Sequence, residues 1–291
     1  MKLILEAVVN GLLMGGVYAL MASGLTLVYG VMEVVNIAQG IFVVAGAYLS
    51  YTLQQRLHLD LFLGLLVTVP IMFVLGLFIE WAMLRRLKRD RIVLSVLVTF
   101  ALTLVIEGVL GLIYGASLVY LHAWYISNSF QIFGFYISYI YVFAFLLSTL
   151  LLGALYLLVY RTTFGFSLRA SMQNRAAALL VGIDVEQVQA ITFGIGVSLA
   201  AAGGMAFGAT NVFNANSSFD LITRLLVIIV LGGMGSLWGA LIASLLMLVI
   251  GDVTAVVWSP IWSNTMFFVL LIALLLARPQ GLFGQREGRK Q

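Results

Sequence analysis

The chain has 291 residues, of which 63% are hydrophobic and only 9% are charged, whereas a typical soluble domain has about 25% charged residues. Apolar runs of about 20 residues recur along its length, which predicts an all-α polytopic membrane protein without a soluble catalytic domain. The net charge of +4 does not suggest a nucleic-acid partner, and the absence of cysteine excludes disulfides, thiolate metal sites and cysteine nucleophiles.

The first predicted elements are an apolar span at 3–29 and a polar interruption at 31–40, VMEVVNIAQG. The interruption places Asn36 and Gln39 between two apolar runs, and the second of these runs is short for a full crossing. Polar residues at membrane depth are costly unless they are buried in protein or face a water-filled cavity. We therefore predict that 31–54 is a broken or re-entrant element.

Three full spans are expected in the middle of the chain, at 61–84, 92–113 and 139–160. The first ends in RRLKRDR (85–91), the strongest positive-inside signal in the sequence, which we interpret as a topology anchor. The second contains Thr99 and the acidic Glu107. An ionisable residue inside a membrane is a functional candidate by default, although a residue near the outer end of a span can also reach into water. The charge-free, tyrosine-rich stretch 114–138 fits an outer loop.

The second half of the chain has spans at 187–208 and 265–277, with a polar outer loop predicted at 211–220. Between them, the apolar sequence from 221 to 250 is interrupted by LGGMGSLWG (231–239). Glycines weaken a helix and allow sharp changes of direction. The glycine cluster therefore predicts a second broken element.

Basic residues set the predicted orientation, because short basic segments stay on the cytoplasmic side. Most Lys and Arg residues lie in four places: Lys2, 85–91, 161–175 and the tail 278–290. These four basic segments lie on the same side of the membrane only if 31–54 and 221–250 turn back without crossing it. We therefore expect six full crossings and two broken or re-entrant elements, about eight hydrophobic helices in a single transmembrane domain over 1–291, with both termini cytoplasmic. The same plan in both halves would be an internal repeat, which is common in transporters.

The longest polar interruption is 161–186, and its middle, 167–181, has apolar residues at helical spacing. This pattern predicts a short amphipathic helix, which Gly182 would end. A cytoplasmic helix between two spans has nothing of its own to bury, so it is suited to docking in a groove on a soluble partner. The alternative is a plain polar loop between membrane helices.

No catalytic site, metal site or cofactor is expected. The sequence lacks a Walker-type phosphate-binding loop, and His58 and His122 have no paired acidic ligand. Breaks in membrane helices expose backbone groups and helix ends that can meet a polar solute. The alternative for the glycines is close helix packing. The predicted solute pathway comprises Asn36, Gln39, Gly40, Thr99, Glu107, Gly232, Gly233, Gly235 and Ser236.

Several motifs resemble the branched-chain amino acid (LivH-type) subfamily of ABC-transporter permeases. Residues 36–40, NIAQG, are similar to the family's Asn-Phe-Ala-His-Gly, with Gln39 in place of the usual histidine. Residues 232–239 and 278–284 also match the family closely. The family's coupling-loop motif, through which the permease inserts into the ATPase subunit, is matched at Arg169, Ala170, Asn174, Ala178, Gly182 and Ile183.

The resemblance covers nearly the whole chain and implies a function. It implies a non-enzymatic permease subunit of a bacterial ABC importer in the inner membrane, which receives a branched-chain or similar apolar amino acid from a periplasmic binding protein. Two ATPase subunits would dock on 161–186, a second related permease would complete the assembly, and membrane lipid would surround it. The alternative is a stand-alone secondary transporter or channel, for which the sequence offers few intramembrane ionisable residues, Glu107 and Glu33.

Overall fold

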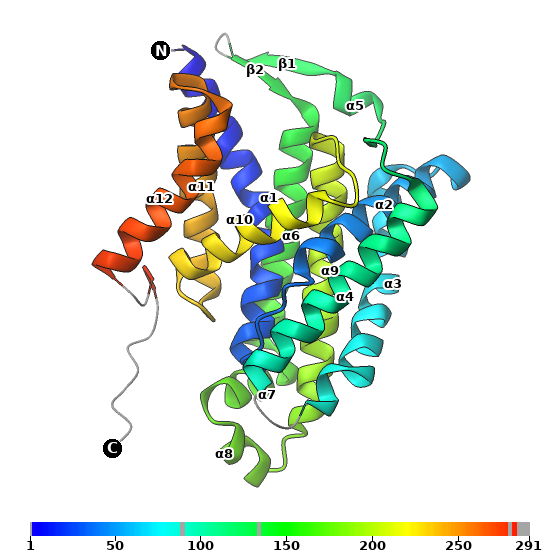
Figure 1. Cartoon of the computed structure of the whole chain (residues 1–291), viewed down its shortest axis with the longest axis vertical. Coiled ribbons are helices and arrows are strands. Elements are labelled where there is room, and N and C mark those ends of the chain that lie inside the picture. The colour runs from blue at the N-terminus through cyan, green and yellow to red at the C-terminus, as the bar shows by residue number, and fades with distance from the viewer. Residues whose placement is uncertain (1, 88–90, 133–134, 279–280, 284–291) are drawn as a thin grey trace.

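Seven helices are long and apolar enough to cross a membrane in the part of the chain that the structure describes. The computed structural model describes residues 2–87, 91–132, 135–278 and 281–283. Figure 1 shows a helical bundle that runs between two ends of the molecule, so the predicted all-α membrane class is confirmed. The seven helices are α1 (Lys2–Met32), α3 (Leu61–Ala82), α4 (Arg91–Tyr114), α6 (Tyr139–Arg161), α9 (Val185–Thr210), α11 (Leu237–Val257) and α12 (Pro260–Ala277).

The remaining elements are shorter. They are α2 (Gln39–Leu57), the 3₁₀ turn η1 (Leu84–Arg86), α5 (Trp124–Ser127), β1 (Ser129–Ile132), β2 (Phe135–Ser138), α7 (Thr163–Gln173), α8 (Arg175–Leu180) and α10 (Ser217–Gly232). The antiparallel pair β1–β2 lies at one end of the molecule, which we call the hairpin end (Figure 1). α7 and α8 project from the opposite end, which we call the coupling end. α2 and α10 lie in the interior between the two ends.

The basic run after α3 lies at the coupling end. Arg85 forms an ion pair with Glu186 near the start of α9, and Arg91 donates a hydrogen bond of 3.2 Å to Gln189 Oε1. Residues 88–90 of this run are outside the described part of the chain. The basic loops after α3 and after α6 therefore share one end of the molecule, as the charge pattern predicts.

The N-terminal half crosses the molecule in a different order from the predicted one. The Glu6 carboxylate accepts a hydrogen bond of 3.2 Å from the backbone of β2, so α1 begins at the hairpin end. α2 ends there too, because the Gln54 side chain accepts a hydrogen bond of 3.1 Å from the His122 N–H. The expectation that Lys2 lies on the same face as the basic loops is therefore wrong. Residues 33–57 cross the molecule instead of turning back.

The non-helical stretch at 33–38 explains this difference. α2 has 19 residues but begins deep in the interior, so it covers only part of the distance between the two ends. The non-helical residues between α1 and α2 supply the remaining length. Such a stretch does not need to be apolar, because its polar groups find partners inside the bundle. A search for apolar runs therefore underestimates the reach of this element.

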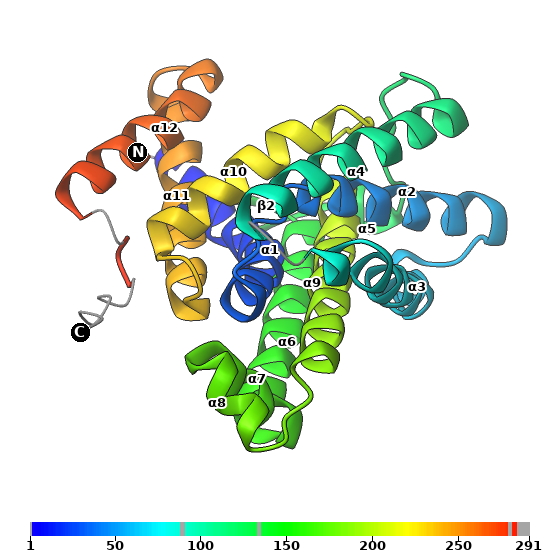
Figure 2. The ribbon, with the colours of Figure 1, turned by 60° about the horizontal axis from the view of Figure 1, so that its bottom comes forward.

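Two sets of four helices, α1 to α4 and α9 to α12, form an inverted repeat. α1 begins at the hairpin end and α9 begins at the coupling end, and each is followed by a shorter interior helix, α2 or α10 (Figures 1 and 2). α1 packs mainly against α11, and α9 packs in the equivalent way against α3. α1 meets α9, and α2 meets α10, at the centre of this arrangement. The internal repeat that the sequence suggests is therefore present, with the second set running in the opposite direction.

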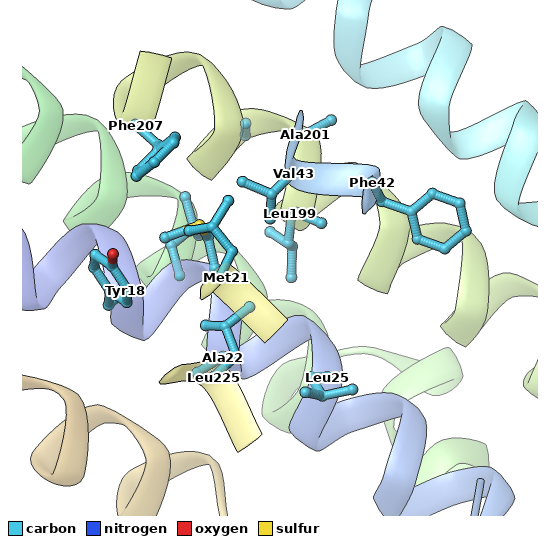
Figure 3. Close-up of a cluster of buried hydrophobic side chains, with 14 of the residues drawn as sticks. Tyr18, Met21, Ala22, Leu25, Phe42, Val43, Leu199, Ala201, Phe207 and Leu225 are labelled. Carbon is cyan, nitrogen blue, oxygen red and sulfur yellow. The ribbon is translucent and has the colours of Figure 1, made fainter. Parts of the chain in front are cut away.

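The core lies where α1, α2, α9 and α10 meet. Figure 3 shows Met21, Val43, Leu199 and Leu225 gathered between these helices. Gly204 allows α9 to approach α2 so closely that a Cβ at this position would overlap the Val43 carbonyl oxygen. Small residues permit this kind of close packing between membrane helices. α4 and α12, by contrast, keep most of their apolar surface exposed.

The hairpin end is held together by polar contacts of the loop after α4. Tyr125 donates a hydrogen bond of 3.0 Å to Asp60 Oδ2, at the start of α3. Burial, together with the hydrogen bond to Asp60 and its negative charge, raises the pKa of the Tyr125 phenol. The phenol therefore stays protonated at neutral pH and keeps donating to Asp60.

Candidate functional site

Asn36 and Gln39 lie at the start of α2, where both side chains are fully buried. Asn36 Nδ2 donates to Gln39 Oε1 at 3.2 Å. Gln39 Nε2 in turn donates to the carbonyl oxygens of Met21 at 3.3 Å and of Gly196 at 3.2 Å. Gln39 thus connects α2 with α1 and α9. In this conformation both side chains are enclosed by protein, which is one of the two environments that polar groups at membrane depth require.

Thr99 of α4 forms a hydrogen bond with the non-helical stretch 33–38 before α2. Its Oγ1 accepts a hydrogen bond of 3.1 Å from the Ile37 N–H, and its hydroxyl donates to the Ser95 carbonyl oxygen at 2.7 Å. Irregular backbone at membrane depth needs such partners because lipid supplies none. The structure therefore brings Thr99 together with the start of α2, as the pathway prediction requires.

Glu107 lies on the same face of α4 but farther along the helix. Ser95, Thr99, Thr103 and Glu107 are four residues apart, so they form one polar stripe. The first three are buried and Glu107 is half-buried. The distance from Thr99 to Glu107 along the axis is about 12 Å. Glu107 is therefore not part of the cluster at the start of α2.

The start of α10 is the counterpart of the start of α2 in the second repeat. The Asn214 N–H donates to Ser217 Oγ and the Ser217 N–H donates to Asn214 Oδ1, both at 3.1 Å. Gly40 of α2 lies directly against this turn, since a Cβ at Gly40 would overlap the Ser218 carbonyl oxygen. The N-terminal ends of two interior helices therefore meet inside the bundle.

Sequence reasoning missed this second helix start. It predicted an outer loop over 211–220, but Phe213, Ala215 and Ser218 are buried, and α10 begins within that range. Asn214 and Ser217 satisfy each other locally, so they do not need solvent. The sequence does contain a signal for this helix start. The spacing of Asn36, Gln39 and Gly40 recurs at positions 214, 217 and 218, and both sets begin with asparagine.

The glycine cluster turns the chain between α10 and α11. Gly233 and Gly235 have φ angles of 94° and 84°, a conformation that is readily adopted only by glycine. Ser236 Oγ accepts a hydrogen bond of 3.1 Å from the Gly239 N–H and caps α11. Gly232 and Gly239 pack so closely that a Cβ on either would overlap the backbone of the other. The predicted second break is confirmed, and its glycines provide both turn geometry and close packing.

The chain after α12 returns to this break. The Leu282 N–H donates to the Leu231 carbonyl oxygen at 2.8 Å, and the Phe283 N–H donates to the Gly232 carbonyl oxygen at 3.1 Å. Two motifs singled out in the sequence are therefore in direct contact. Residues 279–280 and 284 of the second motif lie outside the described residues.

The coupling segment consists of two short helices, whereas the sequence predicts a single helix at 167–181. α7 and α8 meet at Asn174, whose Oδ1 accepts a hydrogen bond of 3.0 Å from the Ala177 N–H. An asparagine side chain that bonds the backbone in this way favours a helix start over a helix interior. Asn174 therefore separates the two helices and caps the second.

α8 ends in a Schellman motif. Gly182 has a φ of 83°, and its N–H donates to the Leu179 carbonyl oxygen at 3.1 Å. The Ile183 N–H donates to the Ala178 carbonyl oxygen at 3.0 Å. This pair of bonds, with glycine in the left-handed conformation, is a common way to end a helix. Gly182 ends the coupling helix, as the sequence predicts.

Arg169 and Ala170 attach α7 to its surroundings. The Arg169 guanidinium donates to the Val159 carbonyl oxygen in the last turn of α6 and lies 5.2 Å from the centre of the Tyr160 ring. A cation at this position is favoured by the negative end of the helix dipole. The Ala170 carbonyl oxygen accepts a hydrogen bond of 3.1 Å from the Asn174 N–H and completes α7.

α8 presents an apolar surface at the tip of the coupling end. Leu180 and the C-cap residue Val181 expose 89% and 75% of their surface, whereas Ala178 is buried. Figure 2 shows α7 and α8 standing apart from the body of the bundle. An apolar patch on a projecting element is a typical interaction site.

The coupling segment contacts the end of α1 and, through it, the glycine break. The Met172 side chain of α7 lies against Gly30 near the end of α1, where an added Cβ would overlap the Met172 methyl group. The same Cβ position is 3.7 Å from Gly235 Cα in the glycine break. α7, α1 and the break therefore form a continuous contact. Within the described residues, no group of His, Cys, Asp or Glu side chains could hold a metal ion.

An inverted repeat of membrane helices, with two interior helix starts and a helical segment projecting from one end, defines a membrane transport protein of the permease class. A family model described as "branched-chain amino acid transport system / permease component" matches residues 7–275. The chain therefore belongs to this family and is a permease component of a branched-chain amino acid transport system.

Curated relatives from bacteria and archaea are similar over nearly their whole length. The permease protein BraD of Pseudomonas aeruginosa, from a high-affinity branched-chain amino acid transport system, is 28% identical over 98% of this chain and 97% of its own length. LivH of Escherichia coli is 27% identical with the same coverage. A probable LivH of Methanocaldococcus jannaschii is 29% identical over 97% of this chain and 92% of its own. No solved structure matches the chain.

Proposed function

We propose that this permease is the membrane-spanning subunit of an ATP-driven importer for branched-chain or similar apolar amino acids. In this proposal a periplasmic binding protein delivers the solute, and ATPase subunits dock on α7 and α8. A second, related permease subunit completes the assembly in the inner membrane. The coupling end then faces the cytoplasm, and the N-terminus of α1 faces the periplasm.

The observation that carries the docking proposal is the exposed apolar tip of α8. Leu180 and Val181 lie in the loop region beyond the membrane spans, where water would be their only neighbour. Exposed apolar surface of this kind is stabilised by a partner, and a short amphipathic helix fits a groove on a soluble protein. The Asn174 cap and the Gly182 end keep α8 helical, so the surface is formed before the partner arrives.

The contact between Met172, Gly30 and Gly235 supports a route for the coupling. A displacement of α7 would reach the end of α1 and the glycine break through packed atoms, without an intervening flexible loop. Packed interfaces transmit such shifts because they are nearly incompressible. In this proposal ATP-dependent movement of α7 changes the relative positions of the interior helices.

The starts of α2 and α10 are the proposed solute-contacting elements. Asn36, Gln39, Gly40 and Thr99 lie together at the first of these starts. Helix N-termini attract carboxylates through their free N–H groups and dipoles, and apolar walls suit a branched side chain. Gly232, Gly233, Gly235 and Ser236 would act through the geometry of the break, and Glu107 would act separately on the α4 face.

A matched pair of variants tests the docking proposal. Leu180 in α8 and Leu112 in α4 are both 89% exposed, but only Leu180 lies on the coupling segment. We expect Leu180→Ala to reduce recovery of the ATPase subunits with the tagged permease at least five-fold, and Leu112→Ala to leave it unchanged. Equal recovery with both variants would contradict the docking role of α8.

Transport in the absence of an ATPase distinguishes the stand-alone alternative. We expect vesicles that contain the permease alone to show no amino-acid uptake under a proton or sodium gradient. Uptake should appear only with the ATPase subunits and ATP. Gradient-driven uptake by the chain alone, abolished by Glu107→Gln, would instead establish a secondary transporter.

A further inference from the structure

A groove of about 400 Å³ runs along the surface of the bundle between α6 and α11. Its floor is α1, where Gly16 lies directly beneath the Phe145 ring. Its other walls come from the middle and end of α6 and from the first turns of α11. The groove is separate from the starts of α2 and α10 and from the coupling surface of α8.

The groove suits an apolar occupant. Its lining surface is almost entirely apolar, and the hydroxyl groups of Ser23 and Thr149 already donate within their own helices. Ser23 Oγ donates to the Leu20 carbonyl oxygen at 2.7 Å, and Thr149 Oγ1 donates to the Phe145 carbonyl oxygen at 2.8 Å. A polar solute would therefore lose its water without gaining partners.

One end of the groove has the chemistry of a membrane interface. Tyr156 and Trp238 line this end, with their ring centres 6.0 Å apart, and Tyr160 follows one turn later. Tyrosine and tryptophan are enriched at the level of lipid headgroups. Arg169 lies over the Tyr160 ring, and the exposed Arg161 is the last residue of α6. Two cations thus lie near the end of α6 that carries these aromatic residues.

The groove is long enough to hold a lipid tail. Phe145 and Tyr160 lie at its two ends, about 22 Å apart along α6 at a rise of about 1.5 Å per residue. The hydrocarbon core of a bilayer is about 30 Å thick, so one leaflet is about 15 Å deep. An acyl chain can therefore lie along the groove while its ester end remains level with the tyrosines.

From these observations we infer that the groove between α6 and α11 binds one anionic phospholipid, with an acyl chain over Gly16 and the phosphate at Arg161 and Arg169. The positive charges near this end of α6 favour a net negative headgroup, because a phosphate accepts charge-assisted hydrogen bonds from guanidinium groups. The lipid would fill the space between two helices that scarcely touch each other. This site does not depend on which solute the permease carries.

Filling the groove tests the proposal. An added Cβ at Gly153 meets nothing within 4 Å, and the same is true of Gly108 on the outer face of α4. Gly153→Leu therefore blocks the groove without a clash, and Gly108→Leu is its matched control. The probe is a phosphatidylglycerol with a photoactivatable acyl chain, added to the assembled transporter in nanodiscs.

We expect the probe to label peptides of α6 and α11, and Gly153→Leu to reduce this labelling at least five-fold while Gly108→Leu leaves it unchanged. Labelling that is insensitive to Gly153→Leu would overturn the site. A phosphatidylcholine probe should label several-fold less, and Arg161→Gln should narrow the difference. Equal labelling by both lipids in the unaltered chain would overturn the preference for an anionic headgroup.

A protein occupant gives a different result. The chain contains no cysteine, so Gly153→Cys introduces a single thiol into the groove. We expect this thiol to react with a membrane-soluble maleimide in the assembled transporter. Protection of the thiol in the assembly, or a disulfide between two copies of the chain, would show that a protein subunit covers the groove and would overturn lipid binding.

Discussion

The starts of α2 and α10 occupy equivalent places in the two repeats, but they are held in different ways. At α2, the Gln39 side chain reaches out to the carbonyl oxygens of Met21 and Gly196, and so binds the helix start to α1 and α9. At α10, Asn214 and Ser217 bond only each other. One start is cross-linked to the bundle, while the other is capped within its own turn.

The difference assigns separate tasks to the two interior helices. Moving α2 along α1 or α9 requires buried hydrogen bonds to break in a medium that cannot replace them. Moving α10 as a unit leaves its own capping bonds intact. α10 also leads directly into the glycine break that lies next to Gly30 and the coupling segment. We therefore expect α2 to act as the fixed side of the interior and α10 as the side that moves.

The largest effect is expected where the two starts touch. In Gly40→Ala the new methyl group would overlap the Ser218 carbonyl oxygen and approach the Ile222 backbone nitrogen at 3.0 Å. Because backbone cannot yield as a flexible side chain does, we expect a loss of about 3 kcal/mol or more in unfolding free energy. Unfolding in mixed micelles measures this loss. Gly108→Ala, which meets nothing within 4 Å, should be neutral.

Removal of the cross-link should have the next largest effect. Gln39→Ala deletes three hydrogen bonds of a buried side chain, and each contributes about 1 kcal/mol. We expect a loss of about 2–3 kcal/mol, measured by thermal unfolding in detergent. Gln39→His, which restores the residue usual in the resembling family, should recover part of it. A loss below about 0.5 kcal/mol, half the contribution of one such bond, would contradict the cross-linking role.

Loss of the hydrogen bond that Thr99 of α4 accepts from Ile37 should reduce the unfolding free energy by a smaller amount. Thr99→Val keeps the shape of the side chain but leaves the Ile37 N–H without its 3.1 Å acceptor. A buried donor left without a partner costs about 1–3 kcal/mol, and we expect about 1–2 kcal/mol here in the same unfolding assay. Thr149→Val is the control, because Thr149 bonds only the carbonyl oxygen of Phe145 in its own helix. Similar losses in both variants would show that Thr99 has no special role.

The smallest effect is expected at the locally capped start. Ser217→Ala removes the hydroxyl that accepts from the Asn214 N–H, and one such hydrogen bond contributes about 1 kcal/mol. Because the bond does not reach α1 or α9, the global stability should change little. Hydrogen exchange should instead rise in the first turn of α10. If Ser217→Ala destabilises the protein as much as Gln39→Ala, the contrast between the two starts is disproved.

Particular residues show where sequence reasoning succeeds and where it fails. Asn36 and Gln39 are recognisable because two polar side chains within apolar sequence require enclosure. Asn214 and Ser217 satisfy each other within four residues, so they have the composition of a surface turn, and only the tertiary structure shows that they are inside. When polar residues find their hydrogen-bond partners close by in the sequence, their polarity does not show whether they lie inside the protein or on its surface.

The predicted orientation of α1 was wrong for a related reason. Lys2 was the single charge that placed the N-terminus with the basic loops, and one charge is a weak constraint beside the packing of a whole helix. The position of the coupling segment followed from its polarity and glycine end. Its division at Asn174 did not, because asparagine at a helix start and asparagine within a helix face give the same pattern.

The pairing of α1 with α11 has a consequence for the synthesis and membrane insertion of the protein. Gly11 lies against the backbone of Val249, where an added Cβ would be 2.6 Å from its Cα, so α1 has its main neighbour in a helix that follows much later in the chain. Contacts of such high sequence separation form late. During synthesis α1 therefore has its glycine face against lipid until α11 has been made. Chains truncated before α11 lack this neighbour and would present that unpaired face to the membrane's quality-control proteases.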